Sequence, residues 1–446
     1  MKYLIRNAEV VNEMKRFFAD VLIDGELIVD IAPAHSLTAT DHTTIIDATG
    51  KLLIPGLIDD QVHFREPGLM HKGEIATESA AAVAGGITSY MEMPNTKPPA
   101  TTIDLLEEKY SRAAECSPAN YSFFMGTSND NLDELLKIDP KKVCGIKIFM
   151  GSSTGNMLVD DETILNRIFS STSMLIALHC EKDPIIAAAL AAFQKEHGRD
   201  PDVTNHGVIR GVDACYASSS QAVEIATRHN TRLHILHIST EKELSLVTKR
   251  IPLTEKRNTE EACIHHLYFT QEDYARLGHR IKWNPSVKTT TDRAAIRAAV
   301  NDDRIDVIAT DHAPHTLEEK ALPYLQAPSG GPLVQHSLLA LLQLYHQGIF
   351  SLENIVRKTS HAVADMFCID RRGYIRKGYF ADLVLVDLEQ KTHIEKAGLL
   401  YKCGWSPFEG ETWKGVVDKT WVNGNLVYSE GKVSNETRGK RLMFNR

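Results

Sequence analysis

The chain of 446 residues lacks the features that mark several protein classes. No apolar stretch approaches the ~18 residues that a membrane-spanning helix needs, and Arg6 interrupts the only apolar run at the N-terminus, where a secretion signal would lie. The seven cysteines are scattered singly, without Cys-x-x-Cys spacing, as is typical of reduced thiols. We therefore expect a cytoplasmic protein with no membrane partner.

Basic charge is also scarce. The 50 Lys and Arg residues are outnumbered by 58 Asp and Glu residues, which gives a net charge of −8. A general nucleic-acid binder needs a basic surface, so nucleic acid is not an expected partner. Low-complexity segments and tandem repeats of solenoid period are absent as well. With 43% hydrophobic and 24% charged residues, the composition is that of a globular protein.

The two ends of the chain carry the same β-hairpin pattern. The pairs Asp24-Gly25 and Asn423-Gly424 each separate two apolar runs, which is a strong hairpin signal. A further short apolar run, Ala381–Asp387, precedes the second hairpin. We predict one small composite β-sandwich domain built from both ends; two unrelated hairpins are the alternative.

The region between the ends alternates apolar runs with helical patterns. The runs that predict strands are Leu57–His63, Ile87–Met93, Tyr121–Met125, Gly145–Met150, Met174–His179, Arg232–Ile238, Asn258–Ala262 and Ile305–Asp311. The helical segments between them include Ile75–Ala84, Asp104–Ala114, Pro184–His197 and Ser219–His229. This alternation predicts an α/β fold, a parallel (β/α)8 barrel of the TIM type. The alternative is a doubly wound open sheet, but no Gly-rich phosphate fingerprint follows the first strand.

These patterns divide the chain into three parts. Residues 1–53 would form the N-terminal part of the β domain, residues 54–369 the barrel, and residues 370–446 the C-terminal part of the β domain with a tail. A barrel of this kind routinely exceeds the ~150 residues of an average domain, so a central part of this length is no obstacle.

Side chains of metal-binding type stand on five of the predicted strands. They are His63, Lys147, His179, His237 and Asp311. Each alone has a structural explanation, such as a core histidine, a lysine whose stem is buried, or an aspartate that caps a helix. In a barrel, however, all five lie at the C-terminal face, where catalytic groups are found. Together they favour a metal site.

Lys147 decides what chemistry such a site would perform. An ammonium group cannot bind a metal, but the carbamate formed by a lysine amine and CO2 can bridge two ions. A metal pair lowers the pKa of a water molecule toward neutrality. Asp311 would take the proton of that water and pass it to a leaving nitrogen. The pattern therefore predicts hydrolysis of an amide, or the reverse condensation.

The sequence around these residues resembles the amidohydrolase superfamily, and more narrowly the dihydroorotases. The first-strand run, Ile54–Gly68, reads IPGLIDDQVHFREPG. Further matching runs follow in order at Gly85–Thr88, Met93–Thr96, Gly145–Met150, Leu178–Glu181, His234–Ser239, Thr259–Leu267, Ala309–His315, Gly378–Asp387 and Ser406–Gly410. Their order and spacing together are specific for a cyclic amidohydrolase.

The resemblance implies an activity and a set of roles. It implies the reversible cyclisation of N-carbamoyl-L-aspartate to L-dihydroorotate in pyrimidine biosynthesis, with Asp311 as the acid/base. It implies two Zn²⁺ ions, held by His63, carboxylated Lys147, His179, His237 and Asp311. It places the substrate carboxylate against Arg65, Asn95 and His315, with Asn284 as a further substrate contact. A guanidinium fork suits a carboxylate, and related hydantoinases generally lack this arginine.

Three residues fit the family pattern less directly. Gln61 stands where the family has the first histidine of His-x-His, and a neutral amide is a weaker ligand, so we expect the ion next to His63 to bind weakly. Asp160 is a rival to Lys147, because some dihydroorotases use an aspartate from the fourth-strand loop. We expect His266 to support the metal ligands through a hydrogen bond.

Two other functions stay open at this point. One is a cyclic amidohydrolase of the hydantoinase, dihydropyrimidinase or allantoinase type. The other is a catalytically silent scaffold for aspartate carbamoyltransferase, which only Gln61 favours. For the enzyme we expect a small-molecule substrate and a homo-oligomer, either a dimer or a tetramer.

Overall fold

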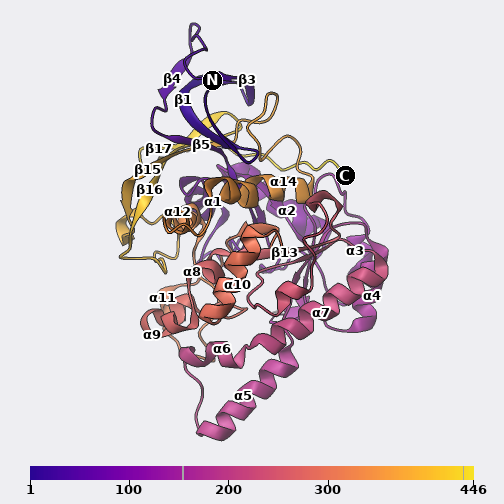
Figure 1. The fold of residues 1–446 in the computed structure, drawn as a ribbon. Helices are drawn as coiled ribbons and strands as arrows, with labels where there is room; N and C mark the ends of the chain where they lie inside the picture. The colour runs from indigo at the N-terminus through magenta and orange to yellow at the C-terminus, as the bar shows by residue number, and fades with distance from the viewer. Residues whose placement is uncertain (153–154, 435) are drawn as a thin grey trace.

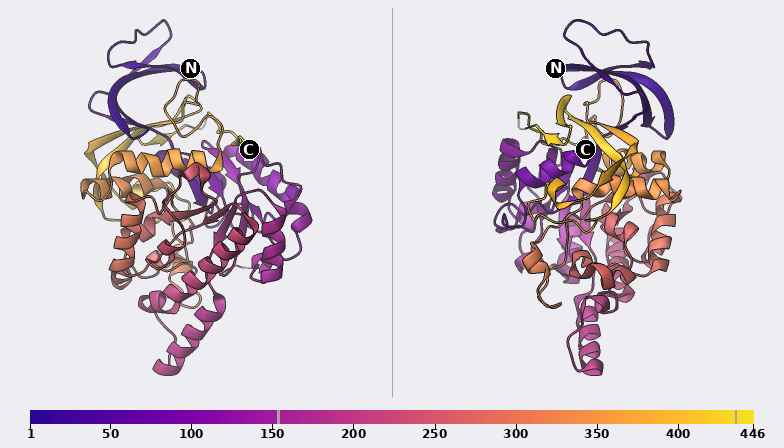
Figure 2. Two further views of the ribbon diagram at one scale, coloured as in Figure 1. Left: turned by 45° about the vertical axis from the view of Figure 1, so that its right-hand side comes forward. Right: turned by 90° about the vertical axis from the view of Figure 1, so that its left-hand side faces the viewer.

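Apolar runs that are buried on both faces form the centre of the molecule, as expected for strands covered by helices. The computed structural model describes residues 1–152, 155–434 and 436–446. A barrel of parallel strands lies in the middle, and a sheet made from the chain ends covers one side of it (Figure 1). Helix α5 extends away from the opposite side, which both views of Figure 2 show.

All eight predicted barrel strands are present. They are β6 (Leu57–Val62), β7 (Ile87–Glu92), β8 (Asn120–Phe123) with β9 (Met125–Gly126), β10 (Ile146–Phe149), β11 (Ile176–His179), β12 (Leu233–Ile235), β13 (Asn258–Cys263) and β14 (Val307–Ala309). The third strand is divided in two at Phe124. Strands β6 to β8 pair in parallel, and so do β9 to β14. A parallel bridge between Val62 and His312 brings the first and last strands together, so the (β/α)8 barrel is confirmed.

The helices follow from local signals in the sequence. They are α1 (Ile75–Ala84), α2 (Ile103–Cys116), α3 (Leu132–Leu135), α4 (Glu162–Ser171), α5 (Asp183–His197), α6 (His206–Ile209), α7 (Val212–His229), α8 (Ile264–Tyr268), α9 (Tyr274–Leu277), α10 (Thr290–Asn301), α11 (Leu317–Lys320), α12 (Ser337–His346), α13 (Leu352–Val356) and α14 (Ala362–Phe367). Thr102, Asp161 and Thr289 accept backbone N–H groups at the starts of α2, α4 and α10. The first and last residues predicted for this helical segment are those of α1 in the structure.

The chain ends form one sheet of nine strands. These are β1 (Lys2–Asn12), β2 (Lys15–Asp24), β3 (Leu27–Pro33), β4 (Thr44–Asp47), β5 (Leu52–Pro55), β15 (Leu383–His393), β16 (Thr412–Val422), β17 (Asn425–Ser429) and β18 (Lys432–Val433). Both predicted hairpins are present, as β2–β3 and β16–β17. Strand β5 joins the two halves, because it pairs with β1 and with β15. The predicted domain boundary at residue 54 falls inside this strand, and the division into domains stays a prediction.

The last residues of the chain return to the barrel, which the sequence patterns did not indicate. The backbone N–H of Leu442 donates to Tyr121 O over 2.9 Å, and that of Phe444 donates to Lys141 O over 3.0 Å. The side chains of Leu442 and Phe444 are buried in the same apolar cluster as Ile58 of the first barrel strand. The tail therefore completes part of the barrel core.

Two expectations from composition can be compared with the structure. Across the described residues, no helix is long and apolar enough to cross a membrane. The seven cysteines are free thiols, in agreement with their scattered spacing.

Truncating a buried side chain of the tail should destabilise the barrel. Phe444 is 2% exposed, and removing a buried phenylalanine side chain costs about 3–5 kcal/mol. We expect Phe444→Ala to lower the melting temperature by several degrees in a calorimetric scan. The neighbouring Met443 is 43% exposed, so Met443→Ala is the matched control and should leave the melting temperature nearly unchanged. Equal melting temperatures for both variants would show that the tail does not contribute to the core.

Candidate active site

A cavity of about 400 Å³ opens where the carboxyl ends of the barrel strands meet. Its lining includes most of the residues predicted from the sequence, namely Gln61, His63, Arg65, Asn95, Lys147, His179, His237, Asn284, Asp311 and His315. These side chains come from different strands and their following loops, and the parallel barrel directs them to one rim.

His63 and Asp311 meet on one side of the cavity. His63 Nδ1 lies 2.8 Å from Asn95 Oδ1, and an amide oxygen only accepts, so Nδ1 carries the proton. Burial lowers the pKa of His63, so its ring is neutral and Nε2 has a free lone pair. That Nε2 lies 3.2 Å from Asp311 Oδ1. Gln61 Nε2 donates to the same oxygen over 3.2 Å.

His179 and His237 face each other on the other side. His179 Nδ1 lies 3.0 Å from His237 Nε2. The second nitrogen of His179 lies 2.9 Å from Glu181, and Arg210 also donates to this carboxylate. Although burial raises the pKa of Glu181, Arg210 and His179 lower it below its usual range, so Glu181 is an anion that accepts the Nε2 proton of His179. His179 Nδ1 is thereby free to bind a metal.

Lys147 lies in the barrel interior between these two groups. Its side chain is 1% exposed, and its Nζ atom has no hydrogen-bond partner within the described part of the chain. Burial lowers the pKa of the ammonium to about 7, so a large fraction of Lys147 is a neutral amine near neutral pH. Its Nζ sits 4.5 Å from the centre of the Phe149 ring.

These side chains fit divalent metal ions. Neutral imidazole nitrogens and carboxylate oxygens are the ligands that Zn²⁺ prefers, and here they face one another at 3.0 Å and 3.2 Å. Burial and the nearby His179 lower the pKa of His237 well below its usual value, so its ring is also neutral. The unpartnered, buried Nζ of Lys147 is the remaining donor position.

One part of the cavity lining is cationic. Arg65 is buried, yet its pKa falls only to about 10, so it stays charged. It donates to Pro314 O over 3.1 Å and lies 3.0 Å from His315 Nε2. Lys72 Nζ lies 3.0 Å from the other nitrogen of His315 and pairs with Glu319 at 2.9 Å. This part of the lining can receive an anionic group of a ligand.

Two acidic neighbours of Arg65 have other partners. Glu66 pairs with Arg112 at 2.8 Å, and Glu74 pairs with Lys402 at 2.9 Å. Neither carboxylate therefore forms a salt bridge with Arg65. Within the described residues, the direct hydrogen-bond contacts of the guanidinium are with Pro314 and His315, which are neutral.

Three of the site residues predicted from the sequence adopt a left-handed backbone conformation. The φ angles are 72° at Arg65, 42° at His237 and 49° at Asp311. Side chains with a Cβ atom rarely adopt such angles, which cost about 1–3 kcal/mol each and are concentrated at functional sites. All three residues follow the end of a strand, and the turn redirects the chain at the rim of the cavity.

The remaining predicted residues lie in different places. Asn284 lines the cavity, and its buried Oδ1 has no partner in the described part of the chain. His266 lies outside the cavity lining, with Nε2 3.2 Å from Pro285 O, so it does not support a predicted metal ligand directly. Asp160 is exposed and also lies outside the lining, which leaves Lys147 as the interior group on the fourth strand and its loop.

Sequence reasoning missed several residues of the site. Lys72 and Ser152 line the cavity, and Glu181 with Arg210 holds His179. Glu181 follows His179 by two residues, which is a signal that could have identified it. The partnership with Arg210 depends on tertiary packing and has no sequence signal.

A second group of metal-type side chains lies deeper in the barrel. The carboxylates of Asp60 and Glu261 approach His234 Nε2 to 3.2 Å and 3.7 Å, and all three residues are fully buried. Burial lowers the pKa of His234, but the two carboxylates more than offset this and raise it to about 9. A charged imidazolium thus lies between the two acids.

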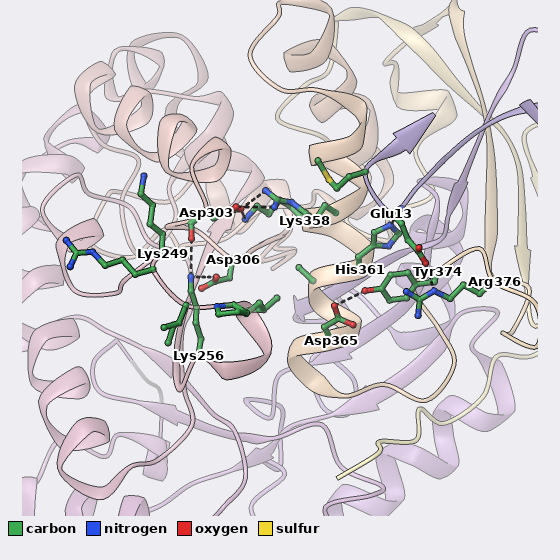
Figure 3. Close-up of a pocket in the computed structure, with 17 residues that line it drawn as sticks. Glu13, Lys249, Lys256, Asp303, Asp306, Lys358, His361, Asp365, Tyr374 and Arg376 are labelled. Carbon is green, nitrogen blue, oxygen red and sulfur yellow. Dashed lines mark hydrogen bonds and ion pairs between the residues drawn. The ribbon is translucent and has the colours of Figure 1, made fainter. Parts of the chain in front are cut away.

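A larger cavity, of about 710 Å³, lies between the barrel and the end sheet (Figure 3). Several of its polar and charged side chains are paired with each other. Lys358 pairs with Asp303 at 2.9 Å, and Tyr374 donates to Asp365 over 2.7 Å. None of the residues predicted for the site line this cavity.

Comparison with known proteins agrees with the geometry. Residues 52–427 match the amidohydrolase family. The chain is 34% identical to a dihydroorotase of Halobacterium salinarum, with 97% of both chains covered, and 32% identical to a dihydroorotase of Bacillus subtilis, with 97% of this chain and 100% of the other covered. Among solved structures, an L-hydantoinase (dihydropyrimidinase) from Arthrobacter aurescens superposes with a TM-score of 0.90 at 25% identity, with 97% of each chain covered.

These matches extend over nearly the whole chain, including the strands that carry the cavity residues. The family is generally metal-dependent, in keeping with the facing imidazole and carboxylate groups. The chain therefore belongs to the amidohydrolase family, as a hydrolase that acts on cyclic amides.

Proposed function

We propose that this chain is a dihydroorotase, which interconverts N-carbamoyl-L-aspartate and L-dihydroorotate. The observation that carries the proposal is Arg65. A buried guanidinium whose described hydrogen-bond contacts are neutral lies in the same cavity as Asp311 and the facing histidines. A buried charge needs a partner, and the carboxylate substituent of dihydroorotate supplies one. Hydantoin and dihydrouracil carry no such group.

The cavity residues would contact two different ends of the substrate. Arg65, with His315 beside it, would hold the carboxylate. Asn284, whose Oδ1 has no partner in the described residues, would accept an N–H of the ring. Asn95 lines the cavity but its Oδ1 already accepts from His63, so only its amide nitrogen is available to a substrate. The amide bond that breaks would then lie toward Asp311.

Two Zn²⁺ ions would complete the site. His63 and Asp311 would hold one ion, His179 and His237 the other, and a carboxylated Lys147 would bridge them. Bound zinc supplies a polarised carbonyl and an activated water for attack on the ring amide. The neutral Lys147 amine, buried and without a hydrogen-bond partner, supports the formation of a carbamate.

Asp311 would move the proton. In hydrolysis its ionised carboxylate takes a proton from the attacking water and delivers it to the departing nitrogen, and in cyclisation the same group acts in reverse. Gln61 donates a hydrogen bond to Asp311 Oδ1, and this bond would hold that carboxylate oxygen in a fixed direction. A homo-oligomer, as a dimer or tetramer, and association with aspartate carbamoyltransferase stay predictions.

Substitution of Arg65 tests the substrate. A bidentate contact between arginine and a carboxylate contributes about 1.5–3 kcal/mol, so Arg65→Met should lower kcat/KM for dihydroorotate by about one to two orders of magnitude. Dihydrouracil, which lacks the carboxylate, should be a poor substrate for both proteins, with little difference between them. Steady-state hydrolysis of both rings measures this. An equal loss on both substrates would mean that Arg65 supports the fold instead.

Lys147 should carry a carboxylate. Native mass spectrometry should show the mass of one added CO2, and Lys147→Ala should lose it together with nearly all activity. Only the neutral amine reacts with CO2. Because the pKa of Lys147 is about 7, carbon-13 NMR of the metal-free protein in labelled bicarbonate should show the carbamate signal declining as the pH falls below 7. A carbamate signal of equal size in Lys147→Ala would assign the modification to another residue.

Asp311 should be essential to turnover. Asp311→Asn keeps the shape of the side chain but cannot accept the proton, and acid–base catalysis typically contributes at least a hundred-fold, so kcat should fall by about 10² or more. Circular dichroism should show an unchanged fold. A variant that keeps more than about a tenth of the wild-type kcat would contradict this role.

A further inference from the structure

Gln61 lines the cavity, and both ends of its side-chain amide have a partner. The side chain is 1% exposed. Its Nε2 donates to Asp311 Oδ1 over 3.2 Å, and its Oε1 accepts from Cys263 Sγ over 3.5 Å. Gln61 comes from β6, Cys263 from β13 and Asp311 from the end of β14, so the amide connects three strands of the barrel.

The chemistry of Asp311 fixes the orientation of this amide. A carboxylate only accepts hydrogen bonds, so Asp311 requires the N–H side. Burial raises the pKa of the Cys263 thiol well above its usual range, so the sulfur keeps its single proton, for which Gln61 Oε1 at 3.5 Å and Glu261 Oε1 at 3.2 Å are both acceptors. The reversed amide would place its oxygen 3.2 Å from a carboxylate oxygen and its N–H groups against the thiol.

Cys263 has a second contact, with the carboxylate of Glu261. Its sulfur lies 3.2 Å from Glu261 Oε1, and the same oxygen accepts the backbone N–H of His237 over 2.9 Å. The second oxygen of Glu261 faces the imidazolium of His234 at 3.7 Å, and Asp60 faces that ring from β6. Gln61 is therefore connected through Cys263 and Glu261 to the fully buried charges of His234 and Asp60.

We propose that Gln61 is a positioning residue that holds the carboxylate of Asp311 in place, and that it is not a metal ligand. Asp311 sets the direction of its amide, and Cys263 supports the carbonyl end. The inference rests on the proposed function in so far as Asp311 is the acid/base. A glutamine at this position supplies a hydrogen-bond donor to Asp311. An imidazole that binds a metal would not supply one.

Two variants of Gln61 separate a donor from a ligand. Gln61→Glu exchanges the N–H donor for a carboxylate, which is a better metal ligand but repels Asp311. Gln61→Leu offers neither a donor nor a ligand. If Gln61 positions Asp311, both variants should lose about ten-fold or more in kcat, since a hydrogen bond to a charged group is lost, with KM changed less than about three-fold. Both should release zinc at the same chelator concentration as the wild type.

If Gln61 is a ligand, the two variants should differ in the opposite sense. Gln61→Glu would then hold zinc more tightly than the wild type, and Gln61→Leu would release one ion at a lower chelator concentration. Zinc content after dialysis against graded chelator, measured by elemental mass spectrometry, decides between the two results and does not depend on activity. An inactive wild type that binds zinc would refute the proposed function, while the zinc curves would still decide the role of Gln61.

Substitution of Cys263 tests the second half of the proposal. Cys263→Ala removes the donor to Gln61 Oε1, and Cys263→Ser keeps one. We expect kcat to fall several-fold in Cys263→Ala and to be largely restored in Cys263→Ser, with zinc binding unchanged in both. Cys116→Ala, at the far end of α2, is the control for loss of a thiol. Equal kcat values for the alanine and serine variants would overturn the role of Cys263.

Discussion

The contact that closes the barrel places the chemistry of the first strand next to that of the last. The backbone N–H of His63 donates to His312 O over 2.7 Å, and Val62 bridges the same residue. Without this contact the sheet would be open, and β6 and β14 would be its two edges. With it, Asp311 comes within 3.2 Å of both His63 and Gln61. Because the strands are parallel, the closure also brings the ends of β10, β11 and β12 to the same rim, so one topological constraint assembles groups that are far apart in the sequence.

The rim combines a rigid frame with local strain. Arg65, His237 and Asp311 have positive φ angles, which are unfavourable for residues with a Cβ atom. Such angles persist only where the surroundings determine the backbone. Here the frame consists of strand ladders and of buried polar contacts, among them the bond from the His237 N–H to Glu261. The polar layer beneath the cavity, in which the His234 imidazolium faces Asp60, is thus part of what keeps the strained residues in place.

Periodicity and strand-end chemistry predicted much of this arrangement, because both depend on local sequence. The eight strands, the bounds of α1 and the two end hairpins follow from apolar runs and from turn residues such as Asn423-Gly424. What sequence could not supply depends on tertiary contacts. The partnership of Glu181 with Arg210, the support of Gln61 by Cys263 and the burial of Phe444 each join segments far apart in the chain. Strands β12 and β14 are shorter than their apolar runs, because the chain leaves the ladder before His237 and Asp311 are reached.

The charged groups of the cavity lining differ in sign, and they would act differently on an anionic ligand. Arg65 and Lys72 are cationic around a neutral His315, whose pKa burial and the nearby Arg65 lower well below the usual value. The atoms of metal-ligand type are neutral imidazoles and the Asp311 carboxylate. An anionic substituent is attracted to Arg65 and Lys72 and repelled from Asp311, so a ring that carries one carboxylate has a preferred direction of entry. Orientation then follows from electrostatics before any contact with the scissile amide forms, and a neutral ring of similar size would have no such preference.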